Sequence, residues 1–241
     1  MNVIITGSNR GIGKAMVEAF ATYGANIWAC ARKSTPEHEA WLKEMAEKAN
    51  VWIKPVFFEL TNKDDINNGI QSIIDDCQSI DVLVNNAGIS TVGLLSMSKV
   101  EEIENLFAIN YFAMLRIIQK VSKRMARQKK GVIINMGSIA GIEPQAGKIA
   151  YGSSKAAVMM MTQCLAKELG PMGIRVNAIA PGPIETKMIH QYNDEMLTKL
   201  AAESALRRLG KKEEIAQVAV FLASDMASYI NGEIIKVDGG R

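Results

Sequence analysis

Short apolar runs alternate with helical stretches along the whole chain, and this alternation constrains the fold more than any other feature. Seven runs rich in valine and isoleucine are predicted to be strands: Asn2–Thr6, Asn26–Ala31, Val51–Phe58, Val82–Val84, Val132–Asn135, Arg175–Ile179 and Ile234–Val237. The segments between them have helical periodicity: Ile12–Thr22, Glu37–Lys48, Lys63–Cys77, an extended pair over Ser98–Arg127, Tyr151–Leu169 and Lys212–Ala223. Strands that are apolar on both faces and joined by helices form a parallel sheet covered on both sides. We therefore expect a doubly wound α/β fold.

The length of the chain predicts a single domain over residues 1–241. Open α/β sheets often reach this size as one unit, and no repeat, low-complexity segment or flexible linker divides the sequence. The segment 183–208 departs from the alternation, because it mixes proline, glycine and charge with several methionines. We interpret it as a lid over the substrate.

The composition excludes several classes of protein. A net charge of +3 gives no general case for nucleic acid, and no apolar run reaches the ~18 residues that cross a bilayer. The first predicted strand stands where a secretory leader would lie, so we expect a cytoplasmic protein without a membrane partner. Cys30, Cys77 and Cys164 lie far apart, and His38 and His190 are isolated, so reduced thiols and no metal site are expected.

Six basic residues gather near the end of one predicted helix. Positive charge is favoured there by the helix dipole and by solvation alone, which is the interpretation we favour. A docking surface for an acidic partner is the alternative. The six residues are Lys120, Lys123, Arg124, Arg127, Lys129 and Lys130.

A glycine-rich loop joins the first predicted strand to the first predicted helix. Glycines in such a loop permit a tight turn and a close approach of the backbone to a pyrophosphate, which the helix N-terminus then faces. A mononucleotide P-loop is excluded, because Lys14 is followed by Ala15 and Ser8 occupies the leading glycine position. We predict that the loop binds a dinucleotide through Gly7, Ser8, Asn9, Arg10, Gly11, Ile12 and Gly13.

The end of the second predicted strand indicates which nicotinamide cofactor is bound. An acidic residue there would accept a hydrogen bond from a free ribose 2′-hydroxyl, and none is present. The strand is instead followed by Arg32 and Lys33, and Arg10 lies in the glycine loop. These cations are suited to a 2′-phosphate, so NADPH is favoured over NADH.

Several motifs in a fixed order give the chain a resemblance to a known family. They are T-G-x-x-x-G-x-G from Thr6, Asn85-Asn86-Ala87-Gly88, Ser138, Tyr151-Gly-Ser-Ser-Lys155, Asn177–Gly182 and the segment from Asn231 to Gly240. Together they resemble the short-chain dehydrogenases/reductases over essentially the full length. Among these, the chain is most similar to the 3-oxoacyl-[acyl-carrier-protein] reductases. The resemblance implies a Rossmann fold.

The chemistry of carbonyl reduction explains why these residue types are needed. Hydride delivered to a carbonyl carbon leaves negative charge on oxygen, which Tyr151 is suited to protonate. A free phenol has a pKa of about 10, and the nearby ammonium of Lys155 is expected to lower it. Ser138 is expected to hold the substrate oxygen. Alone, a tyrosine and a lysine four residues apart would be weak evidence, because such pairs often only pack together.

The resemblance implies roles for further residues. Lys155 would also hold the nicotinamide ribose, and Asn110 would hold a water in a proton relay, although a plain helix-kinking amide is the alternative for Asn110. Asn85 and Asn86 could equally stabilise the central sheet. Glu59 replaces the usual aspartate of the adenine pocket. The other implied cofactor contacts are Leu60, Ala87, Gly88, Pro181, Gly182, Ile184 and Thr186.

The substrate is predicted less narrowly than the reaction. A 3-oxoacyl thioester is favoured. In the relatives that the chain resembles, basic residues beside the mouth of the active site meet an acidic acyl carrier protein. Lys129 matches one such position, but Met172 stands at the other. Another ketone/alcohol pair, such as a sugar, steroid or small diketone, is the enzymatic alternative. A non-catalytic NADP-binding protein is the third reading, disfavoured because all four catalytic positions are filled. The resemblance also implies a homotetramer.

Overall fold

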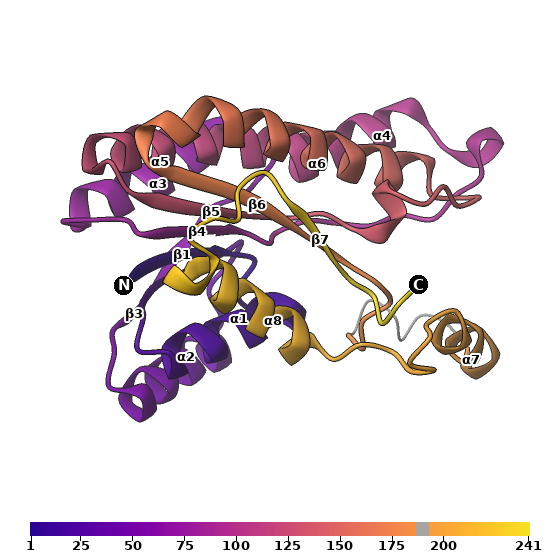
Figure 1. Ribbon diagram of the computed structural model, residues 1–241, viewed down its shortest axis with the longest axis horizontal. Helices are drawn as coiled ribbons and strands as arrows, with labels where there is room; N and C mark the ends of the chain where they lie inside the picture. Colours follow the sequence, from indigo (N-terminus) through magenta and orange to yellow (C-terminus); the bar gives the residue numbers. More distant parts are fainter. Residues whose placement is uncertain (187–192) are drawn as a thin grey trace.

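Seven parallel strands form one sheet in the computed structural model of the protein, which describes residues 1–186 and 193–241 (Figure 1). The strand order is β3-β2-β1-β4-β5-β6-β7. The bounds are β1 Asn2–Thr6, β2 Asn26–Ala31, β3 Ile53–Phe57, β4 Val82–Asn85, β5 Gly131–Met136, β6 Ile174–Pro181 and β7 Ile234–Val237. The predicted doubly wound fold is therefore confirmed, with strand ends shifted by at most a few residues.

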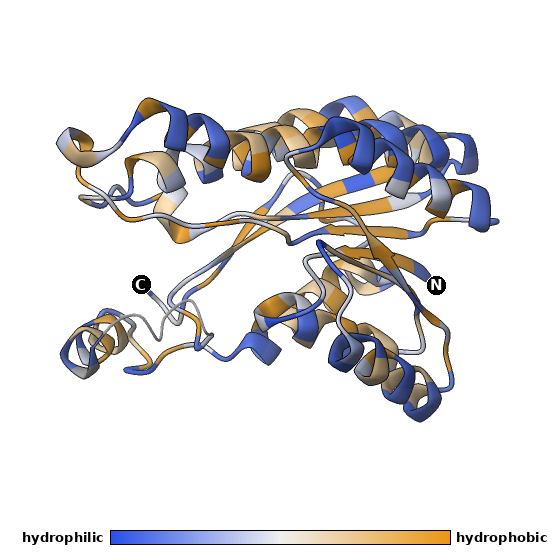
Figure 2. Ribbon diagram, turned by 180° about the vertical axis from the view of Figure 1, so that it is seen from behind, coloured by the Kyte–Doolittle hydropathy of each residue, from blue (hydrophilic) through white to orange (hydrophobic). Residues whose placement is uncertain are grey.

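Helices cover both faces of the sheet, as Figure 1 shows. One layer contains α1 Gly11–Thr22, α2 Pro36–Ala49 and α8 Lys212–Ala223. The other contains α3 Lys63–Asp76, α4 Val100–Phe107, α5 Met114–Gln128 and α6 Ile149–Leu169. Alternate residues of a strand point to opposite faces, so Val3 and Ile5 pack under the first layer and Ile4 under the second. The strands are accordingly mostly apolar, and hydrophilic residues are concentrated on the helices and loops around them (Figure 2).

Two elements differ from the sequence-based expectation. The extended helical pair over Ser98–Arg127 contains a π-helical segment, Ala108–Ala113, between α4 and α5. The expected lid 183–208 contains a helix that periodicity did not predict, α7 Asp194–Ala202, capped by the Asn193 side chain. Residues 187–192 of that segment lie outside the described residues. In Figure 1, α7 stands apart from the layered helices.

The sheet reverses its order of growth between β1 and β4, which are neighbours. Successive strands β1, β2 and β3 are added in one direction, and β4 to β7 in the other. The crevice at the carboxyl ends of the strands beside such a switch point is where open α/β sheets bind ligands. The predicted glycine loop, Arg32, Asn86, Ser138 and Gly182 all follow strand ends at this edge.

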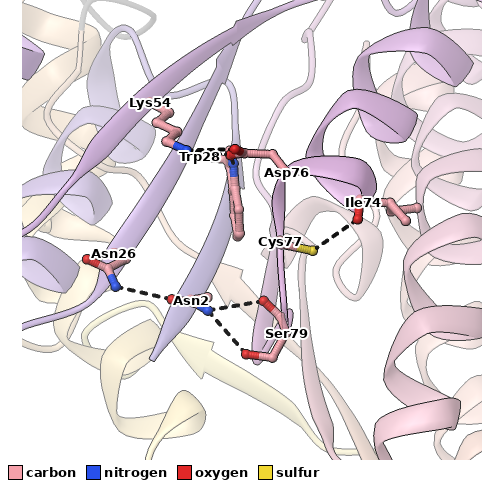
Figure 3. A network of polar contacts seen from close by, with 8 residues as sticks. All are labelled: Asn2, Asn26, Trp28, Lys54, Ile74, Asp76, Cys77 and Ser79. Carbon is pink, nitrogen blue, oxygen red and sulfur yellow. Dashed lines mark hydrogen bonds and ion pairs between the residues drawn. The ribbon is translucent and has the colours of Figure 1, made fainter.

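The opposite, amino edge of the sheet is joined by side-chain hydrogen bonds (Figure 3). Asn26 Nδ2 donates to Asn2 Oδ1 at 3.2 Å, and Asn2 Nδ2 donates to the carbonyl and hydroxyl oxygens of Ser79, both at 3.1 Å. These bonds link the starts of β1 and β2 to the loop before β4.

A second group of contacts at this edge is centred on Asp76, the last residue of α3. Its carboxylate accepts from Trp28 Nε1 at 3.0 Å and from Lys54 Nζ at 2.7 Å (Figure 3). The Lys54 hydrogen bond, together with that from Trp28, lowers the pKa of Asp76. The edge is thus held by polar groups that satisfy one another.

Candidate active site

The glycine loop is fixed by the segment that follows β4. Asn86 Nδ2 donates to the carbonyl oxygens of Thr6 at 3.0 Å and Gly7 at 3.2 Å, while Thr6 Oγ1 accepts from the N–H groups of Asn86 and Ala87. Gly7 has a φ of 68° and Gly11 of 55°, both in the left-handed region that favours glycine. Asn86 therefore holds the glycine loop in shape and links the ends of β1 and β4. This structural role agrees with the alternative that the asparagine stabilises the sheet.

The N-terminus of α1 has unused hydrogen-bond donors. Arg10 stands at the capping position but makes no side-chain cap, and the first turn holds no acidic residue, whereas Thr35 caps α2 and Asn62 caps α3. A Cβ atom on Gly13 would lie 2.0 Å from the Gly7 carbonyl oxygen, so only glycine lets the helix start this close. Free amides at a helix start are suited to a pyrophosphate, so the loop fits the dinucleotide predicted for it.

The other loop residues have different surroundings. Ser8 is fully buried, and its hydroxyl donates to the Cys30 carbonyl oxygen at 3.0 Å, which ties the loop to β2. Asn9 and Arg10 are exposed, and Ile12 is half-buried. Side-chain contacts from this loop to a cofactor are therefore open to Asn9 and Arg10.

The ends of β2 and β3 bring together the residues predicted to distinguish NADPH from NADH. Arg32 is exposed, with 71% of its side chain accessible, and its Nε lies 3.9 Å from Glu59 Oε2. The backbone N–H of Glu59 donates to the Asp65 carboxylate at 2.5 Å. Lys33 is also exposed. The sequence did not predict that the arginine and the glutamate form a pair, because they follow different strands and are far apart along the chain.

Leu60, expected near adenine, lines a cavity of about 530 Å³ beside the start of α3. The other wall of this cavity is formed by the π-helical segment and α5, including Phe112 and Arg116.

Ser138 and Lys155 stand at the carboxyl end of β5. Ser138 follows this strand, and its Oγ accepts from the Ala140 N–H at 3.2 Å. Lys155 Nζ donates to the Met136 carbonyl oxygen at 2.8 Å, although only 4% of the residue is accessible. Burial lowers the pKa of Lys155 from 10.5 to about 8. The lysine is thus held in place and loses its proton more easily than an exposed one.

Tyr151 begins the face of α6 that carries Lys155. The Lys155 Nζ lies 5.8 Å from the centre of the Tyr151 ring. Burial raises the pKa of Tyr151, and a side-chain hydrogen bond with Ser138 acts in the opposite direction. The direction is the reverse of that expected from sequence, because removal of the phenol from water outweighs the hydrogen bond with Ser138.

Asn110 lies in the π-helical segment and is completely buried. Its Oδ1 accepts from the Ile89 N–H at 2.9 Å, and its Nδ2 donates to the Ile89 carbonyl oxygen at 2.9 Å and to Ser154 Oγ at 3.2 Å. A Cβ on Gly88 would lie 3.0 Å from Asn110 Oδ1 and 3.5 Å from Lys155 Nζ. The Gly88 backbone therefore lies next to both Asn110 and Lys155, and a larger side chain there would crowd both.

The segment after β6 approaches the glycine loop. Gly182 packs against Asp238, Ile184 is buried and pairs with Gly210, and the Thr186 methyl group would lie 3.8 Å from a Cβ on Gly11. Pro181 ends β6 itself. Loops after β1, β4, β5 and β6 thus converge at one edge.

Lys148 is a residue beside the tyrosine that the sequence-based search missed. Its Nζ lies 5.7 Å from the centre of the Tyr151 ring, about as close as that of Lys155. The sequence did contain a sign of this neighbour, because a basic residue stands three positions before the tyrosine.

The two positions considered for carrier-protein docking lie elsewhere. Lys129 precedes β5 and Met172 precedes β6, so both are at the amino edge of the sheet, not beside the mouth of the site as expected. The Gly131 N–H donates to the Gly173 carbonyl oxygen at 3.2 Å, which places the two loops together. The expected placement is wrong for a single chain, because both loops lead into the strands whose far ends bear the site.

Within residues 1–186 and 193–241, no group of three or more histidines, cysteines or acids could hold a metal ion. Across the same residues, no helix combines the length and apolar character required to span a membrane.

Comparison with known proteins identifies the class. A family described as enoyl-(acyl carrier protein) reductase matches residues 7–241. Together with the fold, this shows that the chain belongs to the short-chain dehydrogenase/reductase family and is an oxidoreductase.

Individual relatives are of two kinds. The 3-oxoacyl-[acyl-carrier-protein] reductases FabG of Thermotoga maritima and Aquifex aeolicus are 38% and 36% identical over 237 residues, which cover 98% of this chain and 96% and 95% of theirs. The L-sorbose reductase of Gluconobacter frateurii, solved with NADPH and L-sorbose, has a TM-score of 0.92 at 31% identity and covers 99% of this chain and 95% of its own. A putative gluconate dehydrogenase of Agrobacterium tumefaciens has the same TM-score at 30% identity and covers 99% of this chain and 94% of its own.

Proposed function

We propose that the protein reduces a carbonyl group to a secondary alcohol with NADPH. The observation that carries this proposal is the convergence of Ser138, Tyr151 and Lys155 at the sheet edge that also bears the uncapped start of α1. A pure nucleotide-binding protein has no evident need for this trio.

The roles of the residues follow from their chemistry. A bound dihydronicotinamide would supply hydride to the carbonyl carbon. Tyr151 gives its proton to the oxygen as negative charge develops there, and Ser138 donates a hydrogen bond that holds that oxygen. Protonated Lys155 stabilises the phenolate that remains, and Asn110 supports the path by which the proton is replaced. The raised pKa of Tyr151 keeps the phenol protonated before the reaction.

NADPH is proposed over NADH because cations surround the expected position of the 2′-phosphate. Arg10, Arg32 and Lys33 are exposed there. The pair with Glu59 reduces the preference without removing it, because an exposed ion pair contributes little and Arg32 can exchange partners. The proposal is supported by the NADPH complex of the L-sorbose reductase.

A 3-oxoacyl thioester is the substrate that the FabG relatives suggest. An acyl carrier protein docked at Lys129 would be at the far edge from Tyr151 of the same chain. Carrier docking there therefore requires a second copy whose active site it reaches, which joins this proposal to that of a homotetramer. Exposed Phe112 and Met160 on the long helices are apolar groups that an assembly would cover. A cytoplasmic location fits the three free cysteines.

A sugar ketone is the second candidate substrate, supported by the similarity to the L-sorbose reductase. The test is an NADPH-consumption screen over 3-oxoacyl thioesters, simple ketones, quinones and sugars with the purified full-length chain. Oxidation of NADPH with at least one ketone, lost in Tyr151→Phe, is the expected result. No turnover with any of them would refute the proposed function.

A further inference from the structure

Lys148 is a second cation beside the proposed acid. It precedes α6, is half-buried, and directs its ammonium to 5.7 Å from the Tyr151 ring centre. Unlike Lys155, which donates to a backbone carbonyl, its ammonium forms no hydrogen bond or ion pair with the residues that the structure describes. A half-buried ammonium without an acidic partner is suited to bind an anionic group of a ligand.

The acidic residue nearest to Lys148 in sequence is already paired. Glu143 lies 3.2 Å from Arg241 Nε and 3.9 Å from Lys236 Nζ. The Arg241 guanidinium also contacts Glu203 at 2.6 Å, in the segment after α7. Glu143 is therefore held by two cations and is not a partner for Lys148.

The surroundings of Lys148 are otherwise neutral. It lines a cavity of about 470 Å³ at the start of α6, and the remaining lining residues carry no charge. Leu95, Ile142 and Ile149 form apolar parts of the wall, and Gln145 and Ser153 supply polar groups. Tyr151 and Ser138 are not in the lining. Lys148 lines the cavity and also lies beside the Tyr151 ring, so it connects the cavity to the proposed acid.

We infer that Lys148 binds a carboxylate of the carbonyl substrate, so that the substrate is a keto acid. Its carbonyl would meet Tyr151 while its carboxylate meets the ammonium, and its carbon chain would enter the cavity. One ammonium without a second cation matches a singly charged carboxylate better than a phosphate, which carries −1.5 to −2 at neutral pH and usually recruits several donors. The inference rests on the proposed carbonyl reduction and replaces the neutral thioester by a free acid.

The test compares 3-oxohexanoate with its methyl ester, which has the same carbon skeleton without the charge. NADPH oxidation is followed for the wild type, Lys148→Gln, Lys148→Arg and, as a control for net charge, Lys43→Gln on the outer surface of α2. We expect the wild type to prefer the acid. The acid-to-ester ratio of kcat/KM should fall about 10- to 100-fold in Lys148→Gln, mainly through the KM of the acid, because a charge-assisted hydrogen bond is lost.

The conservative variant and the control sharpen the result. Lys148→Arg should restore most of the ratio and Lys43→Gln should leave it unchanged. A ratio that is the same in Lys148→Gln as in the wild type overturns the inference, and so does a wild type that prefers the ester.

Binding is measured in parallel so that failure of the reaction can be distinguished. Calorimetry with hexanoate and hexanamide on the NADP⁺-loaded chain requires no turnover. Hexanoate should bind more tightly than hexanamide, and only hexanoate should weaken in Lys148→Gln. Charge-dependent binding without reduction of any ketone would refute the proposed function alone, and equal binding of the two compounds would refute the role of Lys148.

Discussion

The two edges of the same sheet show opposite uses of polar groups. At the amino edge, Asn2, Asn26 and Asp76 are paired with neighbouring side chains, and the pKa of Asp76 is lowered because its charged form is stabilised. At the carboxyl edge, burial raises the pKa of Tyr151 and lowers that of Lys155, because the charged form of each is less stable there than in water. Polar groups stabilise the fold at one edge, and at the other they are held in states that chemistry can use.

The largest expected effect comes from removing the phenol at the carboxyl edge. Tyr151→Phe should lower kcat for carbonyl reduction by about 10²- to 10⁴-fold, because the proton donor is lost while the ring still packs. NADP⁺ affinity, measured by fluorescence titration, and the melting temperature should remain close to wild type. A variant with near-normal kcat would show that another group gives the proton.

The buried lysine predicts a pH dependence of stability. The folded-state pKa of Lys155 is about 8, below its ordinary 10.5, so between these values the unfolded chain binds the proton more tightly. Lys155 should therefore add stability as pH rises across this window, by up to about 3 kcal/mol. Buried Cys30 and Tyr151 act in the opposite direction at the upper end, because their pKa values are raised. Urea denaturation of the wild type and of Lys155→Met from pH 7 to 10.5 isolates the lysine, and the difference between the two free energies should rise with pH. A difference that does not change with pH would contradict the lowered pKa.

The cofactor preference should depend on Arg32. Arg32→Ala is expected to weaken NADPH binding by about tenfold, since one charge-assisted contact to the 2′-phosphate is lost, while NADH binding changes little. Glu59→Gln, which frees Arg32, should act in the opposite direction. Fluorescence titration with both cofactors is the measurement, and an equal loss for NADPH and NADH would argue against this assignment.

The smallest effect is expected at the amino edge. Asp76→Asn should lower the melting temperature by about 2 °C, because the contact with Lys54 is exposed and an amide oxygen can still accept from Trp28. Since the folded-state pKa of Asp76 is lowered, its contribution is present above the unfolded pKa and is lost on acidification through the folded one. Calorimetry at pH 7 and pH 3 checks this, with kcat expected to be unchanged. A large loss of kcat would show that the two edges are coupled.

What could be predicted from sequence reflects the range of each interaction. Strands such as β1 and β6 were identified because continuous apolar runs are local patterns. Tyr151 and Lys155 were proposed as site residues because they follow Ser138 in an ordered set of motifs, since their spacing alone is weak evidence. The Arg32–Glu59 pair was missed because its members meet across two strands. The raised pKa of Tyr151 was missed because burial depends on the whole surrounding fold.

Helix α7 escaped prediction for another reason. Its 9 residues are fewer than the roughly 11 to 18 over which helical periodicity is recognised. Lys148 was overlooked because a lysine before a helix is usually a solvated surface group, and only its position relative to the Tyr151 ring sets it apart.

The π-helical segment Ala108–Ala113 lets one continuous helical stretch pack against two different helices. A π turn accommodates roughly one extra residue, and each residue rotates a helix by about 100°, so the faces before and after it are out of phase. The half before the turn, α4, can thus lie against α6, while the half after it, α5, lies against α3. Deleting a single residue there would bring the two halves into phase and swing the Asn110 amide away from Ile89.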